Sequence, residues 1–227
     1  MEDFFKSREA ASIAAAKRIQ LALNNRLSAQ RSASLVVSGG TTPGRCLEEL
    51  AHSDTEWDRV HVLLSDERWV PADDDSSNEK LVRETLLVNG AAAARFQPAY
   101  AAGQDVADRC RALDTEIRAL PFPFACALLG MGADGHFASL FPDAENLDEG
   151  LNVDSSKLCI PVSTASSPHP RISLTLAALS RSDEIVLLFF GAEKLEVYEE
   201  AKRQNNGYPI ARLLRQKRAP VRVYWAP

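Results

Sequence analysis

Two side chains suited to acid–base chemistry, Asp134 and His136, stand in the glycine-rich stretch "LLGMGADGHFASLFPD" at residues 128–143. The stretch follows an apolar run typical of a buried strand, so its turn is expected at the strand exit. A neutral imidazole suits general-base chemistry because histidine ordinarily titrates near neutral pH, and a neighbouring carboxylate can orient it. We therefore predict His136 as a general base; the alternative is that it only caps or hydrogen-bonds its own turn.

Three glycines of this stretch have the G-x-G-x-x-G spacing of a dinucleotide-binding turn: Gly130, Gly132 and Gly135. A dinucleotide site needs a helix running on from the third glycine and an acidic residue at the end of the next strand. Here Pro142 follows shortly after the third glycine, and the acidic candidate Asp154 precedes the next predicted strand. Asp134 would also put a negative charge in the turn that wraps a pyrophosphate. These features argue against a dinucleotide.

A second candidate loop is "SGGTTPGRCLEEL" at residues 38–50. Its glycines, Gly39 and Gly40, allow backbone N–H groups to approach a ligand closely, and Thr42 and Pro43 are predicted as the N-cap and first residue of a helix. A glycine-rich turn before a helix N-terminus is a natural seat for phosphate, although the Walker A pattern is missing. The alternative is an ordinary turn before a capped helix.

A third loop, "LLSDERWVPADDDSSNEKL" at residues 63–81, places Asp66 and Arg68 at a strand exit. A carboxylate there can act as a base or orient one, and a guanidinium can hold an anion. Ser77 or Asn78 is expected to cap the next helix. Two further cations stand in "RISLTLAALSRSDEIVLLFFGAEKLEV" at residues 171–197, where Arg171 and Lys194 could bind a phosphate together with the glycine-rich loop.

Alternating strands and helices are expected to position these loops. Strands are predicted at 34–38, 60–65, 124–130, 157–162, 184–191 and 221–225, and helices at 7–31, 43–51, 78–88, 104–119, 192–203 and 209–217. This alternation predicts an α/β fold, doubly wound, with a mostly parallel sheet between two helical layers (Rossmann-like three-layer) and a single domain over 1–227. The three loops all follow strands, so they should meet at one edge of the sheet.

Composition limits the classes of partner and compartment. The net charge of −5, with 45% hydrophobic and 25% charged residues, is ordinary for a globular protein and argues against nucleic acid as a partner. The four cysteines are far apart, which favours reduced, buried thiols over zinc ligands or disulfides. The N-terminus lacks the pattern of a signal peptide, and no apolar run is long enough to span a membrane. A cytoplasmic protein is expected.

Four segments together resemble the 6-phosphogluconolactonase family, which is related to the glucosamine-6-phosphate deaminase/isomerases. They are "SGGTTP", "SDERWVP…SN", "GMGADGHFASLFP" and "RISLTLAAL…FFGAEK", and they occur in the family's order. The resemblance implies a cytoplasmic hydrolase of the pentose phosphate pathway without metal or organic cofactor. Its small-molecule substrate would be 6-phospho-D-glucono-1,5-lactone, opened to 6-phosphogluconate.

The resemblance also implies roles for residues. His136 matches the base that activates water, while Asp134 and Asp66 match acidic positions of the site. Arg68 matches a substrate contact of the D-E-R motif. The matching phosphate contacts are Gly39, Gly40, Thr41, Thr42, Arg171 and Lys194. Phe137 is a departure, because lactonases usually have threonine after the histidine.

Two other functions stay open at this stage, as does the oligomeric state. A deaminase/isomerase would carry N-E-P after the D-G-H stretch, with a glutamate partnering the histidine. Here "SLFPD" occupies that region, and the first glutamate is Glu145. A non-enzymatic sugar-phosphate sensor would need only the phosphate loop, and it would have no use for His136 as a base.

Overall fold

The computed structural model describes residues 1–203 and 207–227 of the chain. Within these residues seven strands form one sheet, in the order β1-β10-β9-β6-β2-β3-β5, and each neighbouring pair is parallel. The strands are β1 (Glu2–Phe4), β2 (Ala33–Val37), β3 (Val60–Leu64), β5 (Arg95–Gln97), β6 (Cys126–Leu129), β9 (Ile185–Phe190) and β10 (Val221–Ala226).

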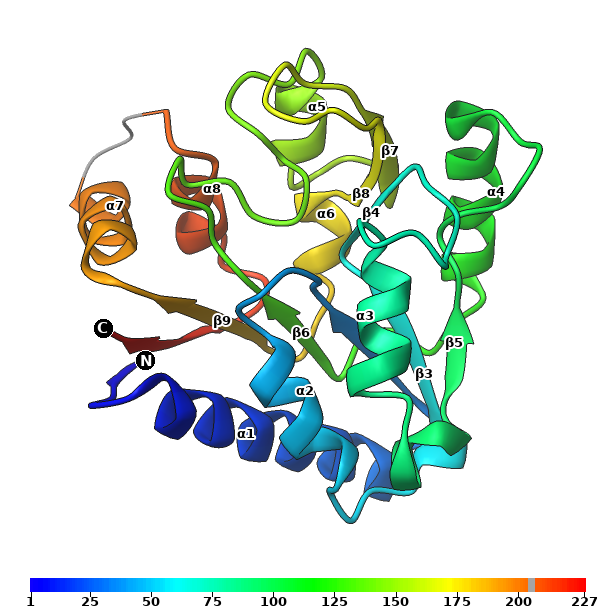
Figure 1. Cartoon of the computed structure of the whole chain (residues 1–227), viewed down its shortest axis with the longest axis vertical. Helices are drawn as coiled ribbons and strands as arrows, with labels where there is room; N and C mark the ends of the chain where they lie inside the picture. The colour runs from blue at the N-terminus through cyan, green and yellow to red at the C-terminus, as the bar shows by residue number, and fades with distance from the viewer. Residues whose placement is uncertain (204–206) are drawn as a thin grey trace.

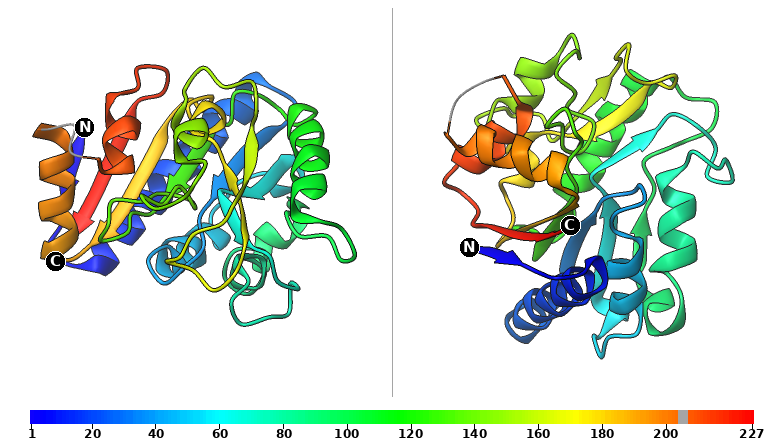
Figure 2. Two further views of the ribbon diagram at one scale, coloured as in Figure 1. Left: turned by 90° about the horizontal axis from the view of Figure 1, so that it is seen from above. Right: turned by 60° about the vertical axis from the view of Figure 1, so that its left-hand side comes forward.

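Helices cover both faces of this sheet (Figures 1 and 2). One face packs against α1 (Arg8–Ala29), α2 (Gly44–Ala51) and α3 (Asn78–Thr85), and the other against α4 (Val106–Arg118), α7 (Ala192–Arg203) and α8 (Pro209–Arg215). Side chains alternate along each strand, so Leu128 of β6 lies in one apolar core and Leu129 in the other. The predicted doubly wound α/β fold is confirmed.

The direction of the crossovers explains which face each helix covers. Right-handed crossovers put helices on one face when the chain moves along the sheet in one direction, and on the opposite face when it returns. The chain runs from β1 through β2 and β3 to β5 with α1, α2 and α3, then returns through β6 and β9 to β10 with α4, α7 and α8. This reversal makes β2 and β6 neighbours whose connections leave in opposite directions.

A second, antiparallel sheet stands beyond the main one, with β8 (Arg171–Leu174) between β4 (Asp66–Arg68) and β7 (Cys159–Val162). The short helices α5 (Leu147–Leu151) and α6 (Leu176–Leu179) accompany it. The expectation that 157–162 joins the parallel sheet was therefore wrong. Its partner β8 was not predicted as a strand, and this pairing decides which sheet 157–162 joins.

Other differences concern element ends. The edge strands β1 and β5 were not predicted, because three residues are too few to show a period. Thr42 was wrong as an N-cap: α2 begins at Gly44, and Pro43 occupies the cap position. Ser77 does cap α3, accepting from the Lys80 N–H at 3.2 Å. In the part of the chain that the structure describes, no helix combines the length and apolarity needed to cross a membrane.

The carboxylate of Glu67 ties β4 to the start of α3. It is 1% exposed and accepts hydrogen bonds from the backbone N–H groups of Asn78 at 2.8 Å and Glu79 at 2.7 Å. The Ser77 hydroxyl donates to it at 3.1 Å. Burial raises the pKa of Glu67, and the backbone donors oppose this rise without cancelling it. A buried acceptor thus satisfies donors that a helix N-terminus leaves free.

We expect Glu67→Ala to lower the free energy of unfolding by about 3 kcal/mol or more, because several buried donors lose their acceptor together. Glu84→Ala removes an exposed carboxylate from the same helix and should change it by less than about 0.5 kcal/mol. Urea denaturation measures both. Equal losses in the two variants would show that the buried cap does not stabilise the fold.

Candidate active site

The loops that follow β2, β3 and β6 meet at the carboxyl edge of the main sheet, beside the point where the strand order reverses. A pocket of about 220 Å³ opens there. Every site residue predicted from the sequence lines it except Asp134, which contacts the pocket residue His136 directly. The expected convergence of these loops is confirmed, because crevices beyond the carboxyl ends of parallel strands form at such reversals.

Asp134 and His136 form a hydrogen-bonded pair. The Asp134 Oδ1 atom lies 2.5 Å from Nδ1 of the imidazole and 3.1 Å from the His136 backbone N–H. Burial raises the pKa of Asp134, but the hydrogen bonds from His136 outweigh it, so this pKa lies below its ordinary value. An ionised Asp134 can only accept, which places a proton on Nδ1 and leaves Nε2 as the acceptor nitrogen.

Gly132 and Gly135 are required by the packing and backbone conformation of this turn, and no dinucleotide is needed to explain them. A Cβ on Gly132 would lie 2.2 Å from Nδ1 of His136 and 2.5 Å from Oδ1 of Asp134, so only glycine lets the pair lie across the turn. Gly135 has φ +74°, and a Cβ there would also press on the Tyr208 side chain at 2.9 Å. The same turn is closed by a hydrogen bond from the Gly132 N–H to the His136 carbonyl at 2.9 Å.

Asp66 lies in the same pocket with a different set of partners. Its Oδ1 accepts from the Ser65 hydroxyl at 2.7 Å and its Oδ2 from the Ser139 hydroxyl at 2.6 Å. A guanidinium nitrogen of Arg171 lies 3.7 Å from Oδ2. Among the described residues no hydrogen bond joins Asp66 to His136, whereas Asp134 makes one. The sequence left open which carboxylate contacts the histidine, and the geometry favours Asp134.

Arg68 projects into the pocket from β4. Its guanidinium donates to the Ser76 carbonyl, while its buried Nε has no hydrogen-bond partner in residues 1–203 and 207–227. Asn78, at the start of α3, donates to the Asp66 carbonyl at 2.8 Å. A Cβ on Gly39 would lie 2.0 Å from the Asn78 Oδ1 atom, so Gly39 is required by this close contact.

The loop after β2 presents unused backbone donors. Gly40 has φ +84°, a left-handed conformation that favours glycine. Within the described chain, the N–H groups of Gly40, Thr41 and Thr42 donate to no backbone or side-chain acceptor. Since Thr42 does not cap α2, its hydroxyl is not engaged there either. These groups can bind an anion at the N-terminal end of α2.

Two cations stand in the same pocket. Arg171 has a side chain 12% exposed, and burial lowers its pKa although Asp66 acts in the opposite direction. Lys194 lies in the first turn of α7; burial lowers its pKa, and the charges of Asp134 and Glu193 only partly oppose this. Half-buried cations with lowered pKa values gain from an incoming anion, which replaces lost hydration.

Several residues of the site were missed from the sequence, among them Ser139, Asn78 and Phe141. Ser139 touches Asp66 and Arg171, Asn78 lines the pocket, and the Phe141 ring lies 4.3 Å from the His136 ring. Ser139 and Phe141 both lie in the stretch that carries His136, which was the available signal. Phe137 is fully buried in the apolar core, so this position contributes packing where a threonine would contribute a hydroxyl.

Comparison with known proteins identifies the family of this chain. The sequence pattern of the family described as "Glucosamine-6-phosphate isomerases/6-phosphogluconolactonase" matches residues 6–225. The chain is 43% identical over 224 residues to a 6-phosphogluconolactonase of Caulobacter vibrioides, covering 98% of this chain and 95% of that protein. A homologue of the same name from Mesorhizobium japonicum is 40% identical over 98% of this chain and 94% of its own length.

A solved structure shows the same arrangement of elements. The crystal structure of a 6-phosphogluconolactonase from Shewanella baltica aligns with a TM-score of 0.96 at 35% identity, covering 100% of this chain and 97% of that one. The family pattern, the relatives and this fold agree over nearly the whole length. This chain belongs to the glucosamine-6-phosphate isomerase/6-phosphogluconolactonase family.

Proposed function

We propose that this protein is a 6-phosphogluconolactonase, which opens 6-phospho-D-glucono-1,5-lactone to 6-phosphogluconate with water. The observation that carries the proposal is the hydrogen-bonded Asp134–His136 pair in a pocket that also holds Arg171 and Lys194. A base and a set of cations in one pocket suit a neutral ester linked to a phosphate. The relatives named above carry the same activity in their names.

His136 is assigned as the general base. Asp134 holds Nδ1, so Nε2 can accept a proton from a water molecule. The oxygen of that water attacks the lactone carbonyl as its proton is transferred. The ionised Asp134 stabilises the imidazolium that forms. The proton then passes to the ring oxygen as the C–O bond breaks. A lactone carries its leaving group within the ring, so no covalent nucleophile is required.

The phosphate is assigned to the loop after β2 and the two cations. Gly39, Gly40, Thr41 and Thr42 supply backbone and hydroxyl donors, and Arg171 and Lys194 supply charge. Such contacts hold the substrate far from C1 and so convert remote binding energy into positioning of the carbonyl. We assign Arg68 to a contact with the substrate between its phosphate and its C1 carbonyl. Asp66 is assigned to holding the Arg171 side chain in position.

A deaminase/isomerase of the same family is the second candidate. A deaminase/isomerase would partner the histidine with a glutamate from the segment after the D-G-H stretch, whereas here that segment supplies the apolar Phe141 ring, which packs against the His136 ring. The protein should therefore accelerate acid release from 6-phosphogluconolactone and release no ammonia from glucosamine 6-phosphate. Binding without turnover of either compound would indicate a sensor.

We also propose a cytoplasmic location. All four cysteines are buried free thiols, and Cys110 and Cys159 form a thiol–thiol hydrogen bond at 3.1 Å without a disulfide, which fits a reducing compartment.

Replacing His136 by asparagine tests the base. Asparagine keeps a polar side chain of similar reach but cannot accept a proton near neutral pH, so kcat should fall roughly 10²-fold or more. The KM should change little, because the phosphate contacts remain. The acidic limb of the kcat/KM profile should disappear with the imidazole, once spontaneous hydrolysis is subtracted. Near-parental turnover with the same limb would place the base elsewhere, with Asp66 first to test.

Replacing Arg171 or Lys194 by alanine tests the phosphate site. Each change removes a charge-assisted hydrogen bond, so KM for the phosphorylated lactone should rise roughly 10- to 100-fold. The unphosphorylated lactone should be a poor substrate for the parent and lose little more in the variants. Lys17→Ala, which removes an exposed cation of α1, should leave both reactions unchanged. Equal losses on both lactones would assign these cations to catalysis or folding.

The lowered pKa of Lys194 predicts a pH dependence of ligand binding. The ammonium is charged below its pKa, so affinity for 6-phosphogluconate should weaken as pH rises through that pKa, which lies below the ordinary lysine value. Lys194→Arg keeps the charge over this range and should give a flatter profile. Calorimetric titration with this stable product avoids lactone decay. If affinity declined with pH equally in the parent protein and in Lys194→Arg, a titrating group other than Lys194 would be responsible.

A further inference from the structure

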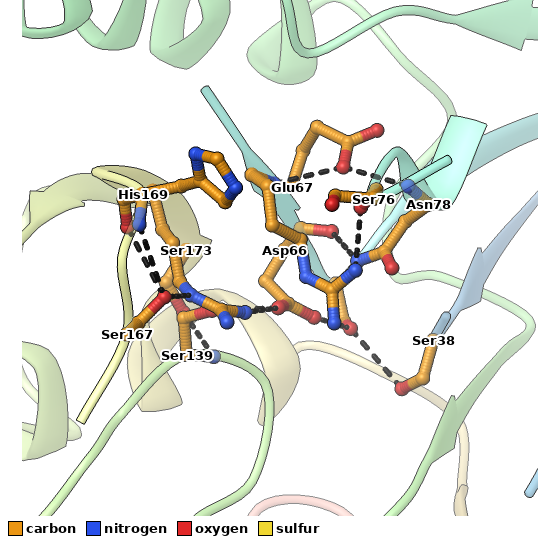
Figure 3. A network of polar contacts seen from close by, with 12 residues as sticks. Ser38, Asp66, Glu67, Ser76, Asn78, Ser139, Ser167, His169 and Ser173 are labelled. Atoms are coloured by element: carbon orange, nitrogen blue, oxygen red, sulfur yellow. Dashed lines mark hydrogen bonds and ion pairs between the residues drawn. The ribbon is translucent and has the colours of Figure 1, made fainter. Parts of the chain in front are cut away.

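A chain of hydroxyl and carboxylate contacts crosses the floor of the site, from the end of β2 to the small sheet (Figure 3). The Ser38 hydroxyl lies 3.1 Å from that of Ser65, and Ser65 donates to Asp66 Oδ1 at 2.7 Å. On the other side of the carboxylate, Ser139 donates to Oδ2 at 2.6 Å. Asp66 is 8% exposed and Ser139 is fully buried, so these contacts are shielded from water.

Arg171 continues this chain and is held on three sides. One terminal nitrogen donates to the Ser139 hydroxyl at 3.3 Å, and Nε donates to the Ser167 hydroxyl at 3.0 Å. The face of the guanidinium lies over the Phe141 ring, 5.1 Å from its centre. A guanidinium has five N–H donors, so these contacts leave others free for a ligand while fixing the plane of the group.

The two partners of the Ser139 hydroxyl determine which hydrogen bond it donates and which it accepts. A carboxylate accepts, so the single hydroxyl hydrogen of Ser139 is directed to Asp66. A guanidinium only donates, so the Ser139 oxygen accepts from Arg171. Ser139 therefore connects two groups that otherwise lie 3.7 Å apart, which is too far for a hydrogen bond.

The backbone around Ser139 is built to hold this position. The preceding residue, Ala138, has φ +49°, a left-handed conformation that a residue with a Cβ rarely adopts. The Ser139 N–H donates to the Ser173 hydroxyl at 3.1 Å, which ties the turn to β8. An unfavourable backbone conformation, such as that of Ala138 before Ser139, is typical of functional sites.

We infer that Ser139 is a positioning residue for substrate binding, which sets the Arg171 guanidinium for the phosphate through the Asp66–Ser139 contact. This inference rests on the function proposed above. Ser139 belongs to the same turn as His136, only three residues further along the chain. One turn thus places the base at one end of the substrate and the phosphate cation at the other, which fixes the distance between them.

Ser139→Ala removes the hydroxyl and no other atom, and Ser180→Ala is its matched control. Ser180 is 2% exposed, and its hydroxyl has no hydrogen-bond partner within residues 1–203 and 207–227. We expect Ser139→Ala to raise KM for the phosphorylated lactone roughly tenfold and to change kcat by less than about threefold. Ser180→Ala should change neither. Loss of kcat without a change of KM, in a variant that thermal unfolding shows to be fully folded, would overturn the inference.

A double-mutant cycle separates action through Arg171 from a general loss of structure. If Ser139 acts through Arg171, the variant carrying both Ser139→Ala and Arg171→Ala should have the KM of Arg171→Ala alone. Multiplying losses would show that Ser139 acts independently of Arg171 and would overturn the inference. Thermal unfolding of all three variants accounts for any folding defect, because a loss of folded protein lowers the apparent kcat and leaves KM unchanged.

A readout independent of turnover keeps this inference separate from the proposed reaction. In ¹⁵N-labelled protein, the Nε–H signal of Arg171 is assigned by its loss in Arg171→Lys. Nε donates to Ser167, but the guanidinium loses its hold on the terminal nitrogen in Ser139→Ala, so the Nε–H should exchange faster with water in this variant than in Ser180→Ala. Titration with inorganic phosphate should show weaker binding only in Ser139→Ala. If the parent protein opens no lactone but these differences hold, the proposed function fails and the positioning role stands. Unchanged exchange and phosphate affinity would overturn that role.

Discussion

The buried carboxylate of Glu67 is the contact on which the geometry of the site depends. Residues alternate along β4, so holding Glu67 against the start of α3 turns its neighbours Asp66 and Arg68 to the opposite side, where both line the pocket. The same contact places Asn78, whose amide donates to the Asp66 carbonyl and packs on Gly39. The loops after β2 and β3 are thereby fixed relative to each other.

The site lies where the parallel sheet meets the antiparallel sheet. The parallel sheet brings the ends of β2, β3 and β6 to one edge, and the reversal of strand order between β2 and β6 opens a crevice there. The antiparallel sheet then closes one side of the crevice, because β4 leaves the main sheet directly after β3 and pairs with β8. Asp66 and Arg171, from these two strands, face each other in the pocket as a result.

One aromatic ring beside the pocket contacts both His136 and Arg171. The Phe141 ring lies against the His136 ring on one side and under the Arg171 guanidinium on another. The imidazole and the guanidinium have separate hydrogen-bond partners: His136 contacts Asp134, and Arg171 contacts Ser139 and Ser167. This separation suits a reaction in which the phosphate anchors the substrate and takes no part in bond breaking.

The sequence by itself determined the features that depend on neighbours along the chain. The α/β alternation, the glycine-rich loop after β2 and the presence of Asp134 and His136 in one turn could be predicted, because each depends on residues close together in the chain. The sequence left open whether Asp134 or Asp66 contacts the histidine. Only the tertiary structure decided contacts between distant segments. Ser139 and Asp66 are 73 residues apart, and Ser139 and Arg171 are 32 apart. The pairing of β4 with β8 brings these residues together, and no local pattern encodes that pairing because each strand is too short to show a period.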